Sequence, residues 1–270
     1  MSETAGLVDG RPLRYRSTAS TGGPWSPDTQ HGGPPNALAV AVAEQLVART
    51  TGRADLTAVR LAADFLGPVP VGELSVTPRV ARAGRSAALV TVAIAPAADP
   101  AGANRPRECL QCRIWFVRNA DTAAVAPVPH PEPVPASAAR ADIAFPYART
   151  LEWRFETGGM SRPGPATAWV RPTVDLLPGH TMSSLSQVVL IADSASGISA
   201  ELSWDEWSFA NVDLDVHIAR PMSGPWLRMA ARTVLGPAGW AVARSELSDE
   251  AGPLGGGLQS LVLAPLTRRE

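Results

Sequence analysis

Apolar residues recur with helical spacing in two stretches of the chain. Between residues 38 and 46 they return roughly every three to four positions, directly after Gly32-Gly33-Pro34-Pro35. Glycine followed by proline in the first turn is typical of a helix start. The same spacing recurs between residues 185 and 192, after the candidate capping residues Ser183 and Ser184. The pattern therefore predicts one helix in each half of the chain.

Strand patterns follow each predicted helix. The stretches 76–80 and 89–94 are rich in β-branched residues around a turn at Ala83-Gly84-Arg85. Residues 210–218 alternate strictly between apolar and polar side chains, which predicts one strand with two distinct faces. A helix followed by an antiparallel sheet, twice over, indicates an α+β architecture. Further strands are expected at residues 226–235, 240–247 and 258–264.

Alanine and proline dominate residues 119–146, with proline at alternate positions from Pro127 to Pro135. Proline fixes φ and removes an amide donor, so this stretch is expected to be an extended linker. It divides the chain into an N-terminal unit, residues 1–118, and a C-terminal unit, residues 147–270.

The two units resemble each other, which indicates an internal duplication. Near the end of each unit, Leu110-Gln111 pairs with Leu258-Gln259. A shift of 153 residues places Val59, Leu61, Pro68, Leu74 and Arg79 on the identical residues Val212, Leu214, Pro221, Leu227 and Arg232.

The composition of the 270 residues narrows the function classes. The net charge is −1, so no basic footprint for nucleic acid exists. All 24 basic residues are arginines, which excludes a lysine Schiff base and a Walker-type phosphate loop. We see neither a signal peptide nor an apolar run long enough to cross a membrane. The expected location is the cytoplasm.

A series of short motifs follows one order along the chain. The motifs are Gly32-Gly33, Phe65-Leu66-Gly67-Pro68, Trp169-Val170-Arg171, Ile191-Ala192-Asp193-Ser194, Asn211-Val212-Asp213 and Leu258-Gln259-Ser260. This ordered set resembles the acyl-CoA thioesterase II family and its actinobacterial thioesterase-like relatives, which have a double hotdog fold. The resemblance implies two antiparallel sheets, each wrapped around a central helix, and hydrolysis of acyl-CoA to free acid and CoA without a metal or other cofactor.

The resemblance also implies catalytic residues. In that family an Asp, a hydroxyl residue and a Gln orient the attacking water, and these positions fall on Asp193, Asn211 and Gln259. Asparagine here offers an amide in place of the hydroxyl group. The first-half counterpart of Asn211 under the shift of 153 is Ala58, and that of Asp193 under a shift of 152 is Ala41, both apolar. The fold itself therefore does not require the polar pair.

His31, Gly32 and Gly33 are candidate substrate-binding residues. The histidine precedes the first helix and could line the acyl or CoA channel. The two glycine amides lie at a helix start, where backbone N–H groups and the helix dipole favour an oxyanion or a phosphate.

Two other groups of residues have simpler interpretations. Asp213, Asp215 and His217 share one strand face with metal-ligand chemistry, but a solvated strand face shows the same pattern. Cys109 and Cys112 form a C-x-x-C without a second pair of ligands nearby. We expect the cysteines to be core residues and predict no metal site.

Other functions on the same fold stay open. A non-catalytic acyl-CoA or acyl-carrier binding protein would fit the asparagine at position 211, and a structural paralogue would have a filled site. A hydratase or dehydratase would need a histidine beside Asp193, and the sequence places none next to it. Hotdog sheets pair edge to edge or through their helices, so a homodimer or higher homo-oligomer is expected.

Overall fold

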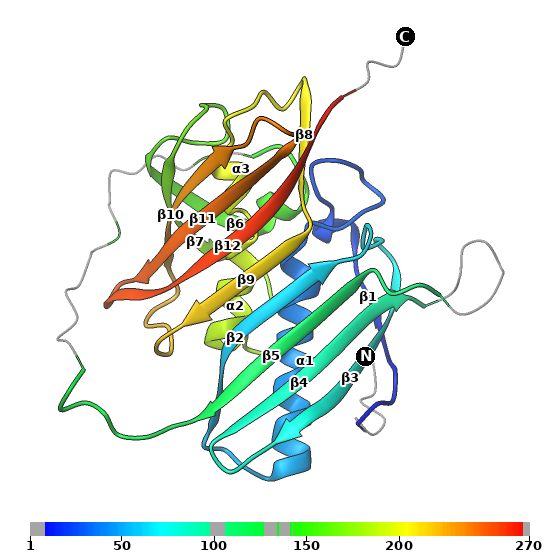
Figure 1. Ribbon diagram of the computed structural model, residues 1–270, viewed down its shortest axis with the longest axis vertical. Coiled ribbons are helices and arrows are strands. Elements are labelled where there is room, and N and C mark those ends of the chain that lie inside the picture. Colours follow the sequence, from blue (N-terminus) through cyan, green and yellow to red (C-terminus); the bar gives the residue numbers. More distant parts are fainter. Residues whose placement is uncertain (1–8, 98–105, 127–133, 135–140, 142, 267–270) are drawn as a thin grey trace.

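Twelve strands form one antiparallel sheet in the computed structural model (Figure 1). The structure describes residues 9–97, 106–126, 134, 141 and 143–266. The alternating prolines of the predicted linker lie outside these residues, and the division into units at 119–146 stays a prediction. The first half of the chain contains β1 (Leu13–Arg16), α1 (Gly33–Thr51), β2 (Leu56–Phe65), β3 (Glu73–Ala83), β4 (Ala87–Pro96) and β5 (Leu110–Arg118). The second half contains β6 (Leu151–Thr157), β7 (Ala166–Pro172), α2 (Ser184–Ala192), α3 (Ala195–Ile198), β8 (Trp207–Asn211), β9 (Asp213–Ile218), β10 (Leu227–Leu235), β11 (Trp240–Asp249) and β12 (Gly252–Pro265).

The strand order confirms the duplication. It runs β1-β3-β4-β5-β2-β9-β12-β11-β10-β7-β6, with β8 pairing to β12. The order β3-β4-β5-β2 in the first half therefore matches β10-β11-β12-β9 in the second. At the centre of the sheet β2 and β9 pair antiparallel, from Arg60 opposite His217 to Asp64 opposite Asp213. The α+β double hotdog predicted from the sequence is confirmed.

Both central strands are interrupted at equivalent positions. The pairing of β2 with β5 shifts register at Val59, and Val212 separates β8 from β9. The expectation of one alternating strand over residues 210–218 is therefore wrong. A bulge shifts the alternation by one residue, so Val212 is exposed, whereas Asn211 turns toward the helices and Leu214 is buried.

The sheet registers also correct one pairing between the halves. Ala58 lies opposite Phe116, and Asn211 lies opposite Leu261. Gln259, two residues before Leu261, therefore corresponds to Ile114 rather than to Gln111. Ile114 is fully buried and apolar.

Proline, glycine and serine residues at the helix ends explain where α1 and α2 start and where α1 ends. Pro34 and Pro35 occupy the first turn of α1, and Gly52 ends it with a φ of 63°, a left-handed conformation that glycine adopts without strain. The Ser183 hydroxyl oxygen accepts the Ser186 N–H at 3.2 Å, which confirms the predicted cap of α2. Asp193 follows directly as the C-cap of that helix.

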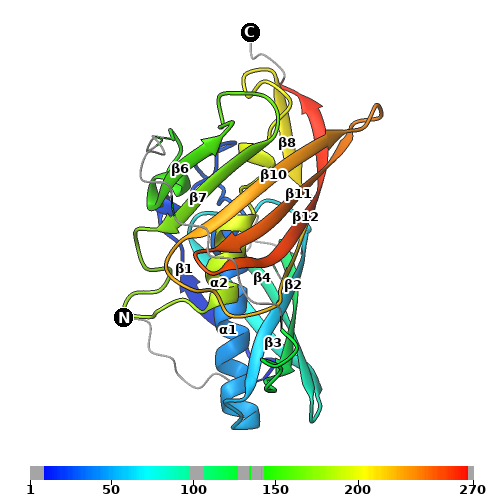
Figure 2. The same cartoon turned by 90° about the vertical axis from the view of Figure 1, so that its left-hand side faces the viewer.

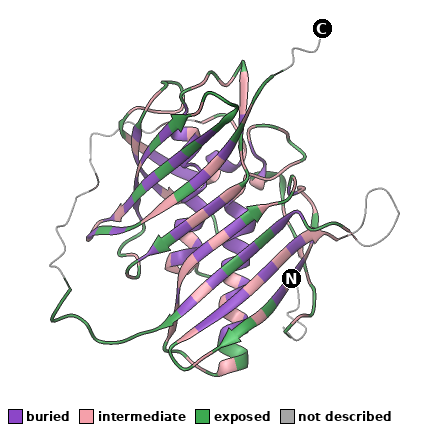
Figure 3. Ribbon diagram, viewed as in Figure 1, coloured by how far each residue is buried: buried purple, intermediate pink, exposed green. Residues whose placement is uncertain are grey.

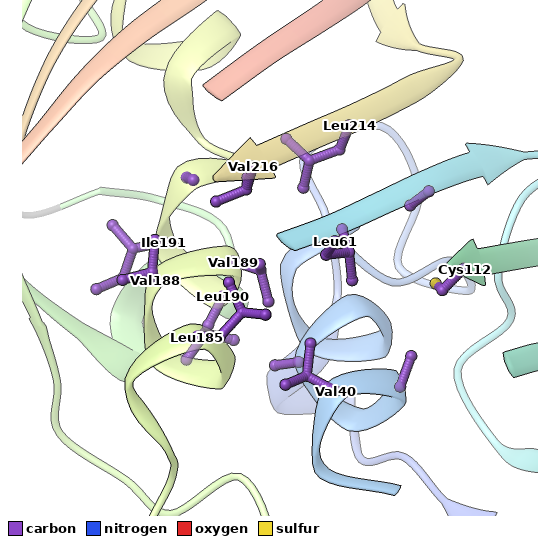
Figure 4. Close-up of a cluster of buried hydrophobic side chains, with 14 of the residues drawn as sticks. Val40, Leu61, Cys112, Leu185, Val188, Val189, Leu190, Ile191, Leu214 and Val216 are labelled. Atoms are coloured by element: carbon purple, nitrogen blue, oxygen red, sulfur yellow. The ribbon is translucent and has the colours of Figure 1, made fainter. Parts of the chain in front are cut away.

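The core lies between the helices and the concave face of the sheet (Figures 2 and 3). Val40 of α1 and Val189 of α2 face Leu61 of β2 and Val216 of β9 (Figure 4). Burying each such side chain contributes about 1.5–3 kcal/mol. The two halves therefore share one apolar core, which fixes the end of α2 relative to the start of α1.

Candidate active site

A cavity of about 490 Å³ lies where the start of α1 meets the end of α2. Its walls come from both halves of the chain: the 23–32 loop, the end of β2, the α2–α3 turn and β8. The polar lining includes Gln30, His31, Asp193, Ser194, Ser196 and Asn211. Residues far apart in the sequence therefore converge on one concave site, the usual form of a ligand pocket.

Asp193 is the centre of the polar cluster. The residue is only 4% exposed, yet it lines the cavity. Its Oδ1 accepts a hydrogen bond from Asn211 Nδ2 at 2.8 Å, and its Oδ2 lies 2.9 Å from His31 Nδ1. The bulge at Val212 is what directs Asn211 toward this carboxylate. A buried carboxylate needs such partners, because burying it unpaired would be costly.

His31 contacts Asp193 through a nitrogen that has a second neighbour. Nδ1 lies 3.1 Å from the Gly33 amide nitrogen as well. One ring nitrogen cannot donate to a carboxylate and accept an N–H at once. A hydrogen bond to ionised Asp193 therefore requires the proton on Nδ1, which leaves Nε2 as the basic nitrogen. The ring stacks on Tyr147 with centroids 3.9 Å apart, which fixes its plane.

Gln259 supports Asp193 from behind and does not line the cavity. Its Nε2 donates to the Asp193 main-chain oxygen at 3.0 Å and lies 3.4 Å from Oδ1. Its Oε1 accepts the Ser196 N–H at 3.1 Å. The side chain thereby bridges the α2–α3 turn and acts on the geometry of Asp193.

The two glycines at the start of α1, Gly32 and Gly33, allow its close approach to α2. A Cβ on Gly32 would lie 2.5 Å from Phe65 Cζ and 2.7 Å from Asp193 Oδ2. A Cβ on Gly33 would collide with the Leu190 carbonyl oxygen. Gly32 lines the cavity, and its amide has no hydrogen-bond partner within the described residues. Gly33 lies behind it and does not reach the cavity.

Aromatic side chains form the apolar wall of the cavity. Trp25 stacks on Trp204 with centroids 5.2 Å apart, and Phe209 meets both rings edge-on. The Trp204 indole N–H donates to the Met160 carbonyl at 3.1 Å. The cavity thus combines a polar end at Asp193 with an apolar end suited to a hydrocarbon group.

The polar side chains of β9 form hydrogen bonds and ion pairs within this chain. Asp213 accepts the Ser260 N–H at 2.5 Å, and Asp215 pairs with Arg60 at 2.6 Å and with His217 at 3.1 Å. Within the described part of the chain, no three His, Cys, Asp or Glu side chains are grouped to hold a metal ion. Nor does any described helix combine the length and apolarity that a membrane span needs.

Cys109 and Cys112 are free and buried, as expected. Burial raises the pKa of the Cys109 thiol to about 11, and that of Cys112 further. Neither is therefore a reactive thiolate.

Sequence reasoning missed Tyr147. Its ring supports His31, and its hydroxyl donates to the Leu190 carbonyl while lying 3.4 Å from the Ser194 hydroxyl. Burial raises its pKa, so it stays a neutral donor. The two aromatics Phe145 and Tyr147 directly after the proline-rich stretch were the only sequence signal.

Two family models match most of the chain. The acyl-CoA thioesterase N-terminal domain matches residues 21–117, and the acyl-CoA thioesterase C-terminal domain matches residues 120–263. No curated protein matches the sequence.

Solved structures share the fold at low sequence identity. The tesB protein of Mycobacterium avium subsp. paratuberculosis has a TM-score of 0.71 at 16% identity, with 97% of this chain and 95% of that one covered. A protein described as a candidate thioesterase from Novosphingobium aromaticivorans has a TM-score of 0.69 at 22% identity, covering 94% and 96%. A hotdog-fold protein of unknown function from Alicyclobacillus acidocaldarius has a TM-score of 0.68 at 15% identity, covering 96% and 95%. These likenesses establish the architecture alone.

Proposed function

Because the chain belongs to the acyl-CoA thioesterase family, we propose that it hydrolyses acyl-CoA thioesters at the cavity around Asp193. The observation that carries the proposal is the contact of one buried carboxylate with His31, Asn211 and Gln259 beside an aromatic wall. The acyl group would lie against the aromatic rings, and the thioester carbonyl would face the polar end.

The proton would pass through His31. Both Asp193 oxygens are engaged by protein donors, whereas His31 Nε2 has no protein partner within the described residues. A water between Nε2 and the thioester carbon would lose its proton to Nε2 as its oxygen attacks. Asp193 would stabilise the imidazolium that forms, as in other Asp–His pairs. The sequence-based expectation had Asp193, Asn211 and Gln259 act on the water directly. In this proposal Asp193 acts through His31, which takes the proton.

The charge that develops on the carbonyl oxygen would meet the Gly32 amide at the start of α1. As the tetrahedral intermediate collapses, the C–S bond breaks and the imidazolium returns its proton to the CoA thiolate. Free acid and CoA leave, and no covalent enzyme intermediate forms. Asn211 and Gln259 would act by holding the Asp193 carboxylate in place.

Free-thiol release from a panel of acyl-CoAs, short to long and aromatic, tests the proposal. We expect release by the natural protein and a loss of about 100-fold or more in Asp193→Ala and in His31→Gln. If only Asp193→Ala loses activity, Asp193 is the base and His31 an auxiliary. Undiminished release in Asp193→Ala would refute the site, and absence of release from every thioester would refute the function.

The His31–Asp193 contact also favours a second candidate function. The sequence placed no histidine beside Asp193, whereas the structure brings His31 to it from the other half. An Asp–His pair can move the two protons of a hydration or dehydration. Incubation with 3-hydroxyacyl-CoA and 2-enoyl-CoA distinguishes the two functions, because dehydration changes enoyl absorbance without releasing thiol.

The cytoplasmic location and the homo-oligomer expected from the sequence stay predictions.

A further inference from the structure

A second groove lies where α2 begins, against the middle of α1. It consists of two adjoining cavities of about 190 and 330 Å³ that share Glu44 and Ser183. Neither shares a residue with the cavity around Asp193. The groove is therefore separate from the candidate active site.

The second groove is built from the duplicated counterparts of the first. The loop before α2 contributes His180, as the loop before α1 contributes the active-site histidine. The face of α1 contributes Ala41 and Glu44, and the bulged strand β2 contributes Ala58. The carboxylate here comes one helical turn after Ala41, the counterpart of Asp193, since residues three apart share a helix face.

Within the described residues, Glu44 differs from Asp193 in having no ion-pair partner. Its carboxylate accepts a hydrogen bond from the Ser183 hydroxyl, and burial raises its pKa to about 7. His180 lines the groove but forms no ion pair with it within the described residues. Arg53, at the far end, is engaged by Asp55 at 2.8 Å and by main-chain carbonyl oxygens.

We propose that this groove binds a small organic cation of the primary alkylammonium class. A partly buried carboxylate without a counter-charge gains most from a ligand that supplies one. The ammonium group would pair with Glu44, and the alkyl chain would lie against Leu176, Leu177 and Met182. The imidazole of His31 supplies the corresponding contact to Asp193 in the first groove. This proposal does not depend on hydrolysis at the first groove.

Isothermal titration calorimetry of the full chain with n-hexylammonium tests the proposed ammonium site. The titration is done at about pH 8, above the pKa of Glu44. We expect one bound equivalent, with n-hexanol binding at least about tenfold more weakly because it lacks the charge. Hexanoate should not bind. Glu44→Gln, which keeps the side-chain shape, should weaken hexylammonium binding at least about tenfold.

Two further variants keep the test decisive. Ala41→Leu, which fills the 190 Å³ cavity while retaining Glu44, should also abolish binding. Asp193→Asn in the other groove should leave hexylammonium binding unchanged. No binding to the natural protein, equal binding to Glu44→Gln, or equally tight hexanol would each overturn the proposal. Loss of binding in Asp193→Asn would assign the amine to the first groove.

Discussion

The two helix junctions of this protein share their architecture and differ in their chemistry. Asp193, Asn211 and Gln259 meet at the first junction, and their counterparts at the second are Ala41, Ala58 and Ile114. Since apolar side chains fill these positions in one half, the fold does not need polar groups there. Burying polar groups costs free energy unless they are hydrogen-bonded, so apolar side chains are the simpler way to fill such positions. Polar side chains at these three equivalent positions in one half alone therefore point to chemistry rather than to stability.

The largest effect should come from closing the first junction sterically. Gly33→Ala would press a Cβ into the Leu190 carbonyl, where main chain must move, and should destabilise the protein by about 3 kcal/mol or more. Gly67→Ala is the matched control, because a Cβ there meets nothing within 4 Å although Gly67 lines the same cavity. Chemical denaturation compares the two variants. Equal stability would mean that the helices do not approach this closely.

The stability of the protein should depend on pH through Glu44, the carboxylate at the second junction. The Glu44 pKa is raised from 4.5 to about 7 in the folded protein, so folding favours the protonated form. Glu44 therefore costs stability as pH rises from about 4.5 to about 7. Glu44→Gln removes this dependence. We therefore expect the free energy of unfolding of the variant, relative to that of the natural protein, to rise by about 1–2 kcal/mol as the pH goes from about 4 to about 8. This figure allows for the partial exposure of Glu44.

Denaturation midpoints of both proteins across this pH range give the difference directly. Parallel curves would show that Glu44 keeps an ordinary affinity for its proton.

A smaller effect should follow from loosening the Asp193 carboxylate. Asn211→Ala removes the 2.8 Å donor, so that within the described residues Oδ1 keeps the longer Gln259 contact alone. We expect kcat to fall roughly tenfold, the equivalent of one lost hydrogen bond to a charged group. Ala58→Asn at the second junction is the counterpart change and should create no activity. Unchanged kcat in Asn211→Ala would remove Asn211 from the site.

The smallest effect should lie on the outer face between the halves. Arg60 and Asp215 form a two-pronged ion pair at 2.6 and 3.0 Å across β2 and β9, with both side chains about one-third exposed. Arg60→Gln should cost less than about 1 kcal/mol, and added salt should reduce that cost. A larger or salt-independent loss would show that the pair holds the halves together.

Local patterns were sufficient to predict α1, α2, β3, β4, β10, β11 and β12, whereas α3, β1, β2, β5, β6 and β7 were not predicted. Helical spacing identified α1 and α2, and Ser183 marked a cap. Alternation failed at Val212, because a bulge is set by pairing with β12, which a single strand's pattern does not contain. Gln111 was paired with Gln259 for the same reason, since register depends on the neighbouring strand.

The candidate site was predicted in part. Asp193, Asn211 and Gln259 meet as the family resemblance implied. The His31 contact was missed, because it depends on how α1 and α2 pack across the shared core, a property of two segments far apart in sequence. Tyr147 was missed for the same reason. It follows the proline-rich stretch, far from His31 in the sequence, and stacks on that histidine only in the folded chain.

The decisive measurement is thiol release by Asp193→Asn and Asp215→Asn, on one acyl-CoA that the natural protein hydrolyses. Both substitutions remove one carboxylate charge, but Asp193 lies in the cavity and Asp215 on the outer face of the sheet. If catalysis depends on the Asp193 carboxylate, kcat falls about 100-fold or more in Asp193→Asn and no more than about twofold in Asp215→Asn. Equal rates in the two variants would show that the Asp193 carboxylate has no catalytic role.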